Sequence, residues 1–206
     1  MTVIAGRRFA CTVARRPTDV ARSVTLVRHG QTERSAVGMY SGQLDVPLTA
    51  TGREQAHRTA RQLAGAGVDA VVTSPLIRAC DTAQAIADAA GVPMTVDERL
   101  IEVDYGPFEG LDRDGARAQF GAAFEAWRAD PFGSPVPGME PLPQALARAR
   151  AATADALAAH EHPVIVGHQG ILRIVLVALG EIEPGDYFTT RLHEAEPVVV
   201  EDPAIA

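Results

Sequence analysis

The stretch VTLVRHGQT, at residues 24–32, joins a short run of apolar and β-branched side chains to a polar segment. An apolar run without alternation is typical of a strand that is covered on both faces. Arg28 and His29 follow the run directly, and Gly30 then allows a tight turn. We therefore predict a buried strand whose carboxyl end presents a guanidinium and an imidazole to a ligand. A lone histidine at a strand end is more often structural than catalytic, so the other strand ends must decide its role.

Further apolar runs predict more strands, two clear ones at residues 70–73 and 164–166 and two weaker ones at 94–96 and 198–200. Alanine-rich segments between them predict helices at about 51–64, 75–90, 144–160 and 171–179. Thr51 and Ser74 occupy expected N-cap positions, and Gly91 and Gly180 occupy expected helix ends. Strands that alternate with helices predict an α/β fold, a three-layer α/β/α sandwich with a mostly parallel central sheet.

A chain of 206 residues is long enough for one domain with some additional segments. We expect the domain at residues 23–201, a tail at 202–206 and a flexible extension at 1–22. The extension is rich in arginine and lacks the apolar stretch of a signal peptide, which favours an extension over a targeting signal. Prolines and aromatic residues interrupt the pattern at 111–143, where we expect a small helical and loop insert that acts as a lid.

Charge and composition exclude several classes of function. All 19 basic residues are arginine, so sites that need a lysine amine are excluded: P-loops, protein kinases, pyridoxal Schiff bases and Ser-Lys hydrolases. A net charge of −7 disfavours nucleic acid and anionic membranes as partners. Two cysteines are too few for a disulfide framework or a zinc site, and no apolar run approaches the roughly 20 residues of a membrane span. We expect a cytoplasmic protein without a metal or a cofactor.

Two more predicted strand ends carry residues of the same kind. The run at 70–73 leads into Ser74 and, one turn later, Arg78, whereas the run at 164–166 leads into Gly167, His168 and Gln169. Because the carboxyl ends of parallel strands meet at one edge of a sheet, two arginines and two histidines should converge there. Bidentate guanidinium groups and helix N-termini both bind phosphate. The sequence therefore predicts a phosphate site at this edge.

Five motifs in this order resemble the histidine phosphatase superfamily, the phosphoglycerate mutase-like group, over about residues 24–200; they lie at 28–32, 40–49, 74–79, 102–110 and 167–170. The segment after Glu102 is more similar to the phosphatase branch. The resemblance implies that His29 takes the phosphoryl group, that Arg28, Arg78 and His168 bind its oxygens, and that Glu102 is the general acid.

These implied roles require particular protonation states. His29 must be unprotonated on the attacking nitrogen, and the two arginines should lower its pKa. His168 can stay cationic when phosphate is bound. An anionic substrate and partial burial should keep Glu102 protonated until the leaving oxygen takes its proton, after which Glu102 can activate water. Without the resemblance, Glu102 would be expected as a surface carboxylate paired with Arg99.

The sequence departs from the family pattern at two places. Arg34 and Ser35 stand where family members often have asparagine, and Gln169 follows the second histidine where glycine is common. Residues 138–140 resemble a glycine–glutamate motif, although Glu140 is equally well explained as an acid at a helix N-terminus. The residues expected to bind substrate are Arg28, Arg34, Ser35, Ser41, Gly42, Arg78, Glu102, His168 and Gln169.

Three functions stay open at this point. A cofactor-independent phosphatase acting on a small phosphomonoester is favoured, a phosphomutase is the first alternative, and an inactive phosphate-binding module is the second. The mutase would need arginines for a substrate carboxylate, and the insert offers Arg113, Arg117 and Arg128. The substrate can be a sugar phosphate, a phosphoglycerate derivative, a nucleotide or a cofactor precursor, and a homodimer is an alternative to a monomer.

The aromatic residues of this region have two interpretations. Either they contact an apolar leaving group or they only pack the lid. The residues concerned are Phe108, Phe120, Phe124, Trp127 and Phe132.

Overall fold

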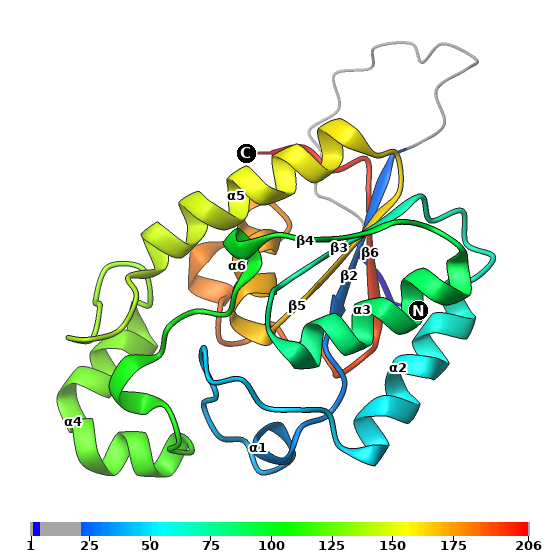
Figure 1. Cartoon of the computed structure of the whole chain (residues 1–206). Coiled ribbons are helices and arrows are strands. Elements are labelled where there is room, and N and C mark those ends of the chain that lie inside the picture. The colour runs from blue at the N-terminus through cyan, green and yellow to red at the C-terminus, as the bar shows by residue number, and fades with distance from the viewer. Residues whose placement is uncertain (1, 5–21, 206) are drawn as a thin grey trace.

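The computed structural model describes residues 2–4 and 22–205 and contains a six-stranded sheet with the order β1-β6-β2-β5-β3-β4 (Figure 1). Its strands are β1 (Thr2–Ile4), β2 (Ser23–Arg28), β3 (Ala70–Thr73), β4 (Met94–Val96), β5 (Pro163–Gly167) and β6 (Pro197–Glu201). Neighbouring strands are parallel except β2 and β6, which pair antiparallel. The mostly parallel sheet predicted from the sequence is confirmed.

Strand register brings the predicted site residues to one edge. β5 lies between β2 and β3, with Arg28 opposite Gly167 and Thr73 opposite Val166. The residues that follow these positions, His29, Ser74 and His168, therefore leave the sheet side by side. This convergence follows from parallel pairing, because parallel strands all end at the same edge.

Helices cover both faces of the sheet, which confirms the three-layer arrangement (Figure 1). On one face lie α2 (Ala50–Leu63) and α3 (Ile77–Ala90), and on the other α5 (Leu142–Ala159) and α6 (Gln169–Ala178). Side chains that are adjacent in a strand alternate between the two cores: Val71 packs with the α2–α3 side and Val72 with the α5–α6 side. Both faces are buried, which explains why the strands lack a polar–apolar alternation.

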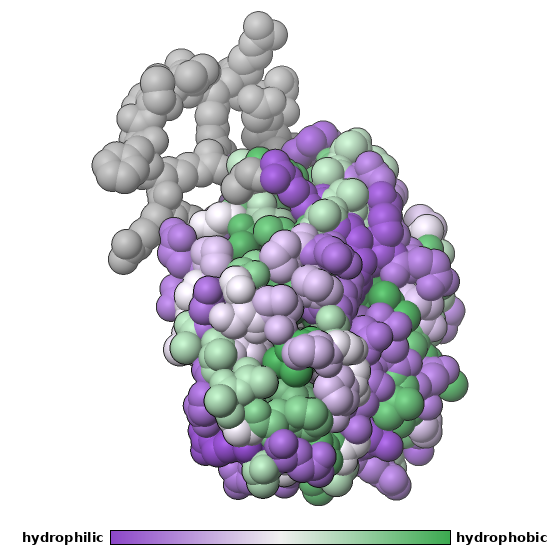
Figure 2. Space-filling view, turned by 90° about the vertical axis from the view of Figure 1, so that its left-hand side faces the viewer, coloured by the Kyte–Doolittle hydropathy of each residue, from purple (hydrophilic) through white to green (hydrophobic). Residues whose placement is uncertain are grey.

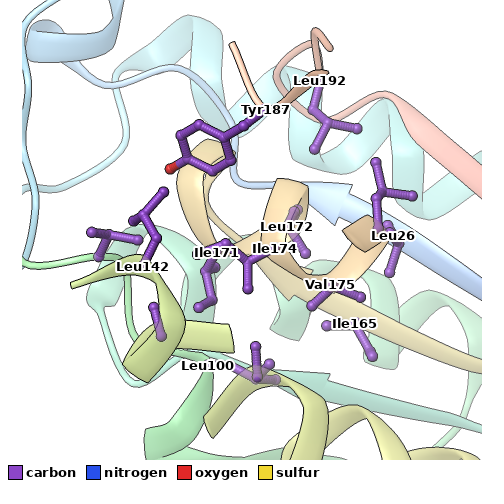
Figure 3. Close-up of a cluster of buried hydrophobic side chains, with 14 of the residues drawn as sticks. Leu26, Leu100, Leu142, Ile165, Ile171, Leu172, Ile174, Val175, Tyr187 and Leu192 are labelled. Carbon is purple, nitrogen blue, oxygen red and sulfur yellow. The ribbon is translucent and has the colours of Figure 1, made fainter. Parts of the chain in front are cut away.

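The larger core lies under α5 and α6. Leu26 and Ile165 of the sheet belong to the same buried cluster as Leu172 and Val175 of α6 (Figure 3), and all four are fully buried. Full burial of each such side chain is worth roughly 1.5–3 kcal/mol, so this core holds α6 firmly against the sheet. The position of α6 matters because its N-terminus forms part of the site described below.

The insert contains α4 (Arg113–Ala129), which Figure 1 shows set apart from the sheet at the end where the site lies; a short helix, α1 (Glu33–Ala36), lies at the same end. Phe108, Phe124 and Trp127 are fully buried and contact one another at ring-centroid distances of 5.5–6.1 Å. These three rings therefore pack the insert itself. Gly121 has a φ of 43°, which divides α4 at a kink.

Two predicted helix starts are wrong. The N-cap of α2 is Thr49, whose hydroxyl accepts from the Gly52 N–H at 3.0 Å, and not Thr51. The α3 helix begins at Ile77 with Leu76 as its N-cap and without a side-chain cap; the Ser74 hydroxyl lies one turn earlier, where it contacts His168 and accepts from the Leu76 N–H at 3.4 Å. In contrast, Gly91 ends α3 in the left-handed conformation, as predicted, with a φ of 69°.

The N-terminal prediction is also corrected in part. Residues 2–4 form β1, which pairs with β6 at the edge of the sheet, so an extension without structure is wrong for these three residues. The remainder of that segment, residues 5–21, lies outside the described residues.

The surface on the α4–α5 side carries groups of hydrophobic residues set among hydrophilic ones (Figure 2). Among the helices of the described chain, none is long and apolar enough to cross a membrane.

Candidate active site

His29 lies at the carboxyl end of β2 with one ring nitrogen committed and one free. Its Nδ1 lies 2.7 Å from the carbonyl oxygen of Gly30, which can only accept, so Nδ1 carries the proton. The side chain is 95% buried, and burial together with Arg28 and Arg78 holds the pKa of His29 well below its usual value of 6.5. At neutral pH, Nε2 is therefore an unprotonated nitrogen, as the nucleophilic role requires.

Arg78 is buried and donates to three different acceptors. Its Nε donates to Nδ1 of His168 at 3.1 Å, and its two terminal nitrogens donate to the carbonyls of Leu44 at 2.6 Å and Gly42 at 2.8 Å. Because Nδ1 of His168 accepts, the proton of this ring is on Nε2, which lies 2.7 Å from the Ser74 hydroxyl. Arg78 thus fixes both the loop at 42–44 and the tautomer of the second histidine.

His168 is neutral in this arrangement; the cationic state that the sequence analysis allowed applies to the protein with phosphate bound. Burial, then Arg78, lowers the pKa of His168 well below its usual value of 6.5. A second proton on Nδ1 would face the Nε–H of Arg78, so the contact itself opposes the imidazolium. The ring lies behind His29, at 5.1 Å between centroids, rather than in the wall of the pocket.

Arg28 has one buried N–H group without a hydrogen-bond acceptor in the described part of the protein. Its terminal nitrogens donate to the carbonyl of Leu192 at 3.2 Å and to Glu194 at 3.4 Å. Its Nε is buried and has no hydrogen-bond partner among the described residues. A buried donor without a partner costs about 1–3 kcal/mol, which an anion in the pocket would remove.

Glu102 is 5% exposed and accepts hydrogen bonds at both carboxylate oxygens. Oε1 accepts from the N–H groups of Val103 at 2.9 Å and Ile171 at 2.8 Å, and Oε2 from that of Gly170 at 3.0 Å. Two of these donors are first-turn N–H groups of α6, which have no acceptor within the helix itself. Gly170 must lack a side chain, because a Cβ there would overlap Oε1 and the Tyr105 hydroxyl.

The pairing of Glu102 with Arg99 that composition alone suggested does not occur. Arg99 instead binds Asp97 at 2.7 Å and Asp155 at 2.8 Å, on the exposed side of the chain. Glu102 instead lines the pocket.

A pocket of about 280 Å³ gathers most of the expected residues. Of the residues expected from the sequence, those that line it are Arg28, His29, Ser35, Ser41, Gly42, Arg78, Glu102 and Gln169. Arg34 is not among them and lines a separate cavity beside α2. Ser35 reaches the pocket, but its hydroxyl is engaged with the backbone of Thr32 as half of a capping box. Neither residue therefore replaces the family asparagine in an obvious way.

Sequence reasoning missed part of the pocket wall. Tyr40, Tyr105, Arg113 and Arg173 all line it, and of these only Arg113 was expected, as an arginine for a substrate carboxylate. Arg173 could have been found from the helical period, since it lies one turn after Gln169 on α6. The two tyrosines carry no sequence signal of this kind.

No group of histidine, cysteine and acidic side chains within the described ranges is arranged to hold a metal ion. The positive charges that line the pocket are four guanidinium groups, those of Arg28, Arg78, Arg113 and Arg173.

The two buried histidines make the fold sensitive to acid. Unfolding returns both to their usual pKa, so below about pH 6.5 the unfolded chain binds more protons than the folded one and stability falls as the pH decreases. We expect a loss of up to about 1.4 kcal/mol per pH unit for each histidine. Urea unfolding between pH 7.5 and 5.5 measures how the free energy of unfolding depends on pH. This dependence should become weaker in His29→Gln, by the contribution of one histidine, and should stay unchanged in the exposed control His57→Gln. An unchanged pH dependence in His29→Gln would contradict the assignment.

Comparison with known proteins gives the same answer from sequence and from structure. The family model of the histidine phosphatase superfamily (branch 1) matches residues 24–202. A curated relative, the 2,3-bisphosphoglycerate-dependent phosphoglycerate mutase of Brucella ovis, is 33% identical over 190 residues, which cover 87% of this chain and 92% of the relative.

Solved structures are similar over most of both chains. Mycobacterial glucosyl-3-phosphoglycerate phosphatase in complex with VO3 has a TM-score of 0.78 and 29% identity, and the match covers 87% of this chain and 90% of that one. A structure named mycobacterial hydrolase 1 has a TM-score of 0.79 and 29% identity, with coverage of 87% and 88%.

Proposed function

Since this chain belongs to the histidine phosphatase superfamily (branch 1), we propose that it hydrolyses a small phosphomonoester through a phosphohistidine on His29. Glu102 is the general acid and base in this proposal, and no cofactor takes part. Similarity to a phosphatase of known structure supports hydrolysis as the reaction.

The free Nε2 of His29 is the observation that carries the proposal. It is unprotonated at neutral pH, it lies in the pocket between Arg28 and Arg78, and the Nδ1 contact to Gly30 fixes the ring. Phosphoryl transfer needs mainly a positioned nucleophile and positive charge around the transferring oxygens. The unpaired Nε of Arg28 and the free N–H groups of Arg78 are suited to those oxygens.

The reaction has two displacements at phosphorus. In the first, the Nε2 lone pair attacks phosphorus, the bond to the leaving oxygen breaks, and Glu102 transfers its proton to that oxygen. In the second, the Glu102 carboxylate takes a proton from water, the water oxygen attacks phosphorus, and the P–N bond breaks. Inorganic phosphate leaves, and His29 and Glu102 return to their starting states.

The pocket also favours a substrate with a second anionic group. Arg113 and Arg173 line it in addition to Arg28 and Arg78, and no carboxylate of the described chain forms an ion pair with either. Of the other insert arginines, Arg117 pairs with Glu125 at 2.6 Å and Arg128 stacks over a phenylalanine ring. A phosphorylated hydroxy acid fits this charge pattern.

A phosphomutase is the second candidate, because Arg113 can serve a substrate carboxylate and a mutase is among the relatives. One experiment separates the candidates. The protein is incubated in EDTA with a panel of phosphomonoesters, including phosphoglycerate and its methyl ester, and free phosphate, isomerised ester and acid-labile phosphoprotein are measured.

We expect phosphate release with a transient phosphoprotein, and a lower KM for phosphoglycerate than for its methyl ester. Isomerisation without phosphate release would replace the proposal by the mutase. Absence of both turnover and labelling with every ester would replace it by an inactive binding module.

A further inference from the structure

Arg148 lies in the middle of α5, outside the pocket, and donates to the backbone segment that carries Glu102. Its Nη1 donates to the carbonyls of Arg99 at 2.7 Å and Ile101 at 2.6 Å, and its Nη2 lies 3.3 Å from the carbonyl of Glu102. One guanidinium therefore holds three carbonyls within four residues. This segment has no strand partner in the sheet, so its shape depends on such contacts.

Glu140 holds Arg148 in place from the other side. The pair is bidentate, with Nε to Oε1 at 2.7 Å and Nη2 to Oε2 at 2.8 Å, and both side chains are more than 80% buried. Glu140 also accepts from the N–H of Asp104 at 3.3 Å, and its own N–H donates to the Asp104 carbonyl at 2.8 Å. The glutamate is thus more than an acid at a helix start. It binds Arg148, which contacts residues 99 and 101, and it also binds the backbone of Asp104, on the other side of residue 102.

Close backbone packing keeps the two segments together. Gly138, with a φ of 86°, lets its carbonyl approach Gly106 so closely that a Cβ on Gly106 would overlap it. Two glycines therefore bring residues 138–140 alongside 104–106. The glycine–glutamate pattern found in the sequence has a physical explanation here.

From these contacts we infer that Arg148, held by Glu140, is a positioning residue that sets where the Glu102 carboxylate stands relative to the leaving oxygen. The Glu102 main chain is fixed by Arg148 on one side, and its carboxylate is fixed by the N-terminus of α6 on the other. A shift of about 1 Å in such a group can cost roughly 100-fold in rate. The inference rests on the proposed acid role of Glu102.

Lysine cannot replace Arg148 in this position. An ammonium is a single point charge, whereas the guanidinium makes a planar fork with Glu140 and still reaches three carbonyls. The Arg148→Lys variant keeps the charge and the long stem, and so tests geometry rather than charge or volume.

The test measures kcat/KM for aryl and alkyl phosphates whose leaving groups span a wide range of pKa. The parameter kcat/KM reports the first displacement, so slow hydrolysis of the phosphohistidine does not mask it. We expect Arg148→Lys to lower kcat/KM for alkyl phosphates by about 100-fold and for p-nitrophenyl phosphate by less than about threefold, because only poor leaving groups need the proton. Glu102→Gln should show the same dependence, and Arg148→Lys should add little to it in the double variant.

Arg150→Lys, an exposed change on the same helix, is the matched control and should leave all rates unchanged. Equal loss for all leaving groups in Arg148→Lys would show a general structural role and overturn the inference. If Arg148→Lys does not fold, Glu140→Gln weakens the same Arg148–Glu140 pair and should show the same dependence of kcat/KM on the leaving group. If the loss of kcat/KM in Glu102→Gln does not depend on the leaving group, the acid role of Glu102 is refuted, and the inference with it. If the loss depends on the leaving group in Glu102→Gln but not in Arg148→Lys, only the role of Arg148 is refuted.

Discussion

Replacing His29 by alanine is expected to lower kcat by about 10⁴-fold or more and to abolish the acid-labile phosphoprotein. The reason is specific to one atom: in the described site, Nε2 of His29 is the pocket nitrogen that is both unprotonated and uncommitted. His168 cannot take over, because its two ring nitrogens bind Arg78 and Ser74.

The measurement combines turnover with rapid acid quench of the labelled protein. Added imidazole should restore part of the turnover of His29→Ala, since the substitution leaves space for a free imidazole beside the two arginines. His57→Ala, an exposed histidine on α2, is the control and should keep full activity. Persistent labelling of His29→Ala would place the nucleophile elsewhere.

Replacing Arg78 by lysine should lower kcat/KM by about 10²–10³-fold and the free energy of unfolding by about 2–4 kcal/mol. Arg78 is 99% buried and serves His168, Gly42 and Leu44 at once. An ammonium cannot satisfy all three acceptors, so at least one is left buried without a partner. The loop at 42–44 then loses its anchor, and His168 loses the donor that fixes its tautomer.

Steady-state kinetics and urea unfolding on the same preparations measure the two effects. Arg58→Lys, on the exposed face of α2, is the matched control. A kcat/KM within threefold of the unmodified protein would show that Arg78 contributes only charge, which lysine supplies equally well.

The fold was predictable because it depends on patterns that are local in the chain. The runs at 70–73 and 94–96 coincide with β3 and β4, and the sheet edge where His29 and His168 meet follows from parallel pairing alone. Helix starts were less predictable. Ser74 had the chemistry of an N-cap, but the helix begins only at Ile77, and the Ser74 hydroxyl contacts a histidine 94 residues away, a contact about which local propensity contains no information.

The site, like the fold, was predictable from the sequence only in part. Strand ends and ordered motifs pointed to the residues proposed as nucleophile and acid and to the two arginines, and the structure places these four residues in one pocket. The sequence did not identify Arg148, whose role depends on carbonyls 46–49 residues away, nor the wall formed by Tyr40, Tyr105 and Arg173. It also misplaced Arg34, which lies in a neighbouring cavity.

By itself, then, the sequence determined which side chains meet at the sheet edge, since apolar runs fix the strands and the residues after them must emerge together. It determined equally that a phosphate-binding site in this chain would have to use guanidinium groups rather than amines, since the chain has no lysine. Only the tertiary structure decided the protonation of His29 and His168, the three N–H donors that hold Glu102 and the Arg148–Glu140 pair behind it. These depend on burial and on hydrogen bonds between residues far apart in the chain, and both exist only after the chain has packed.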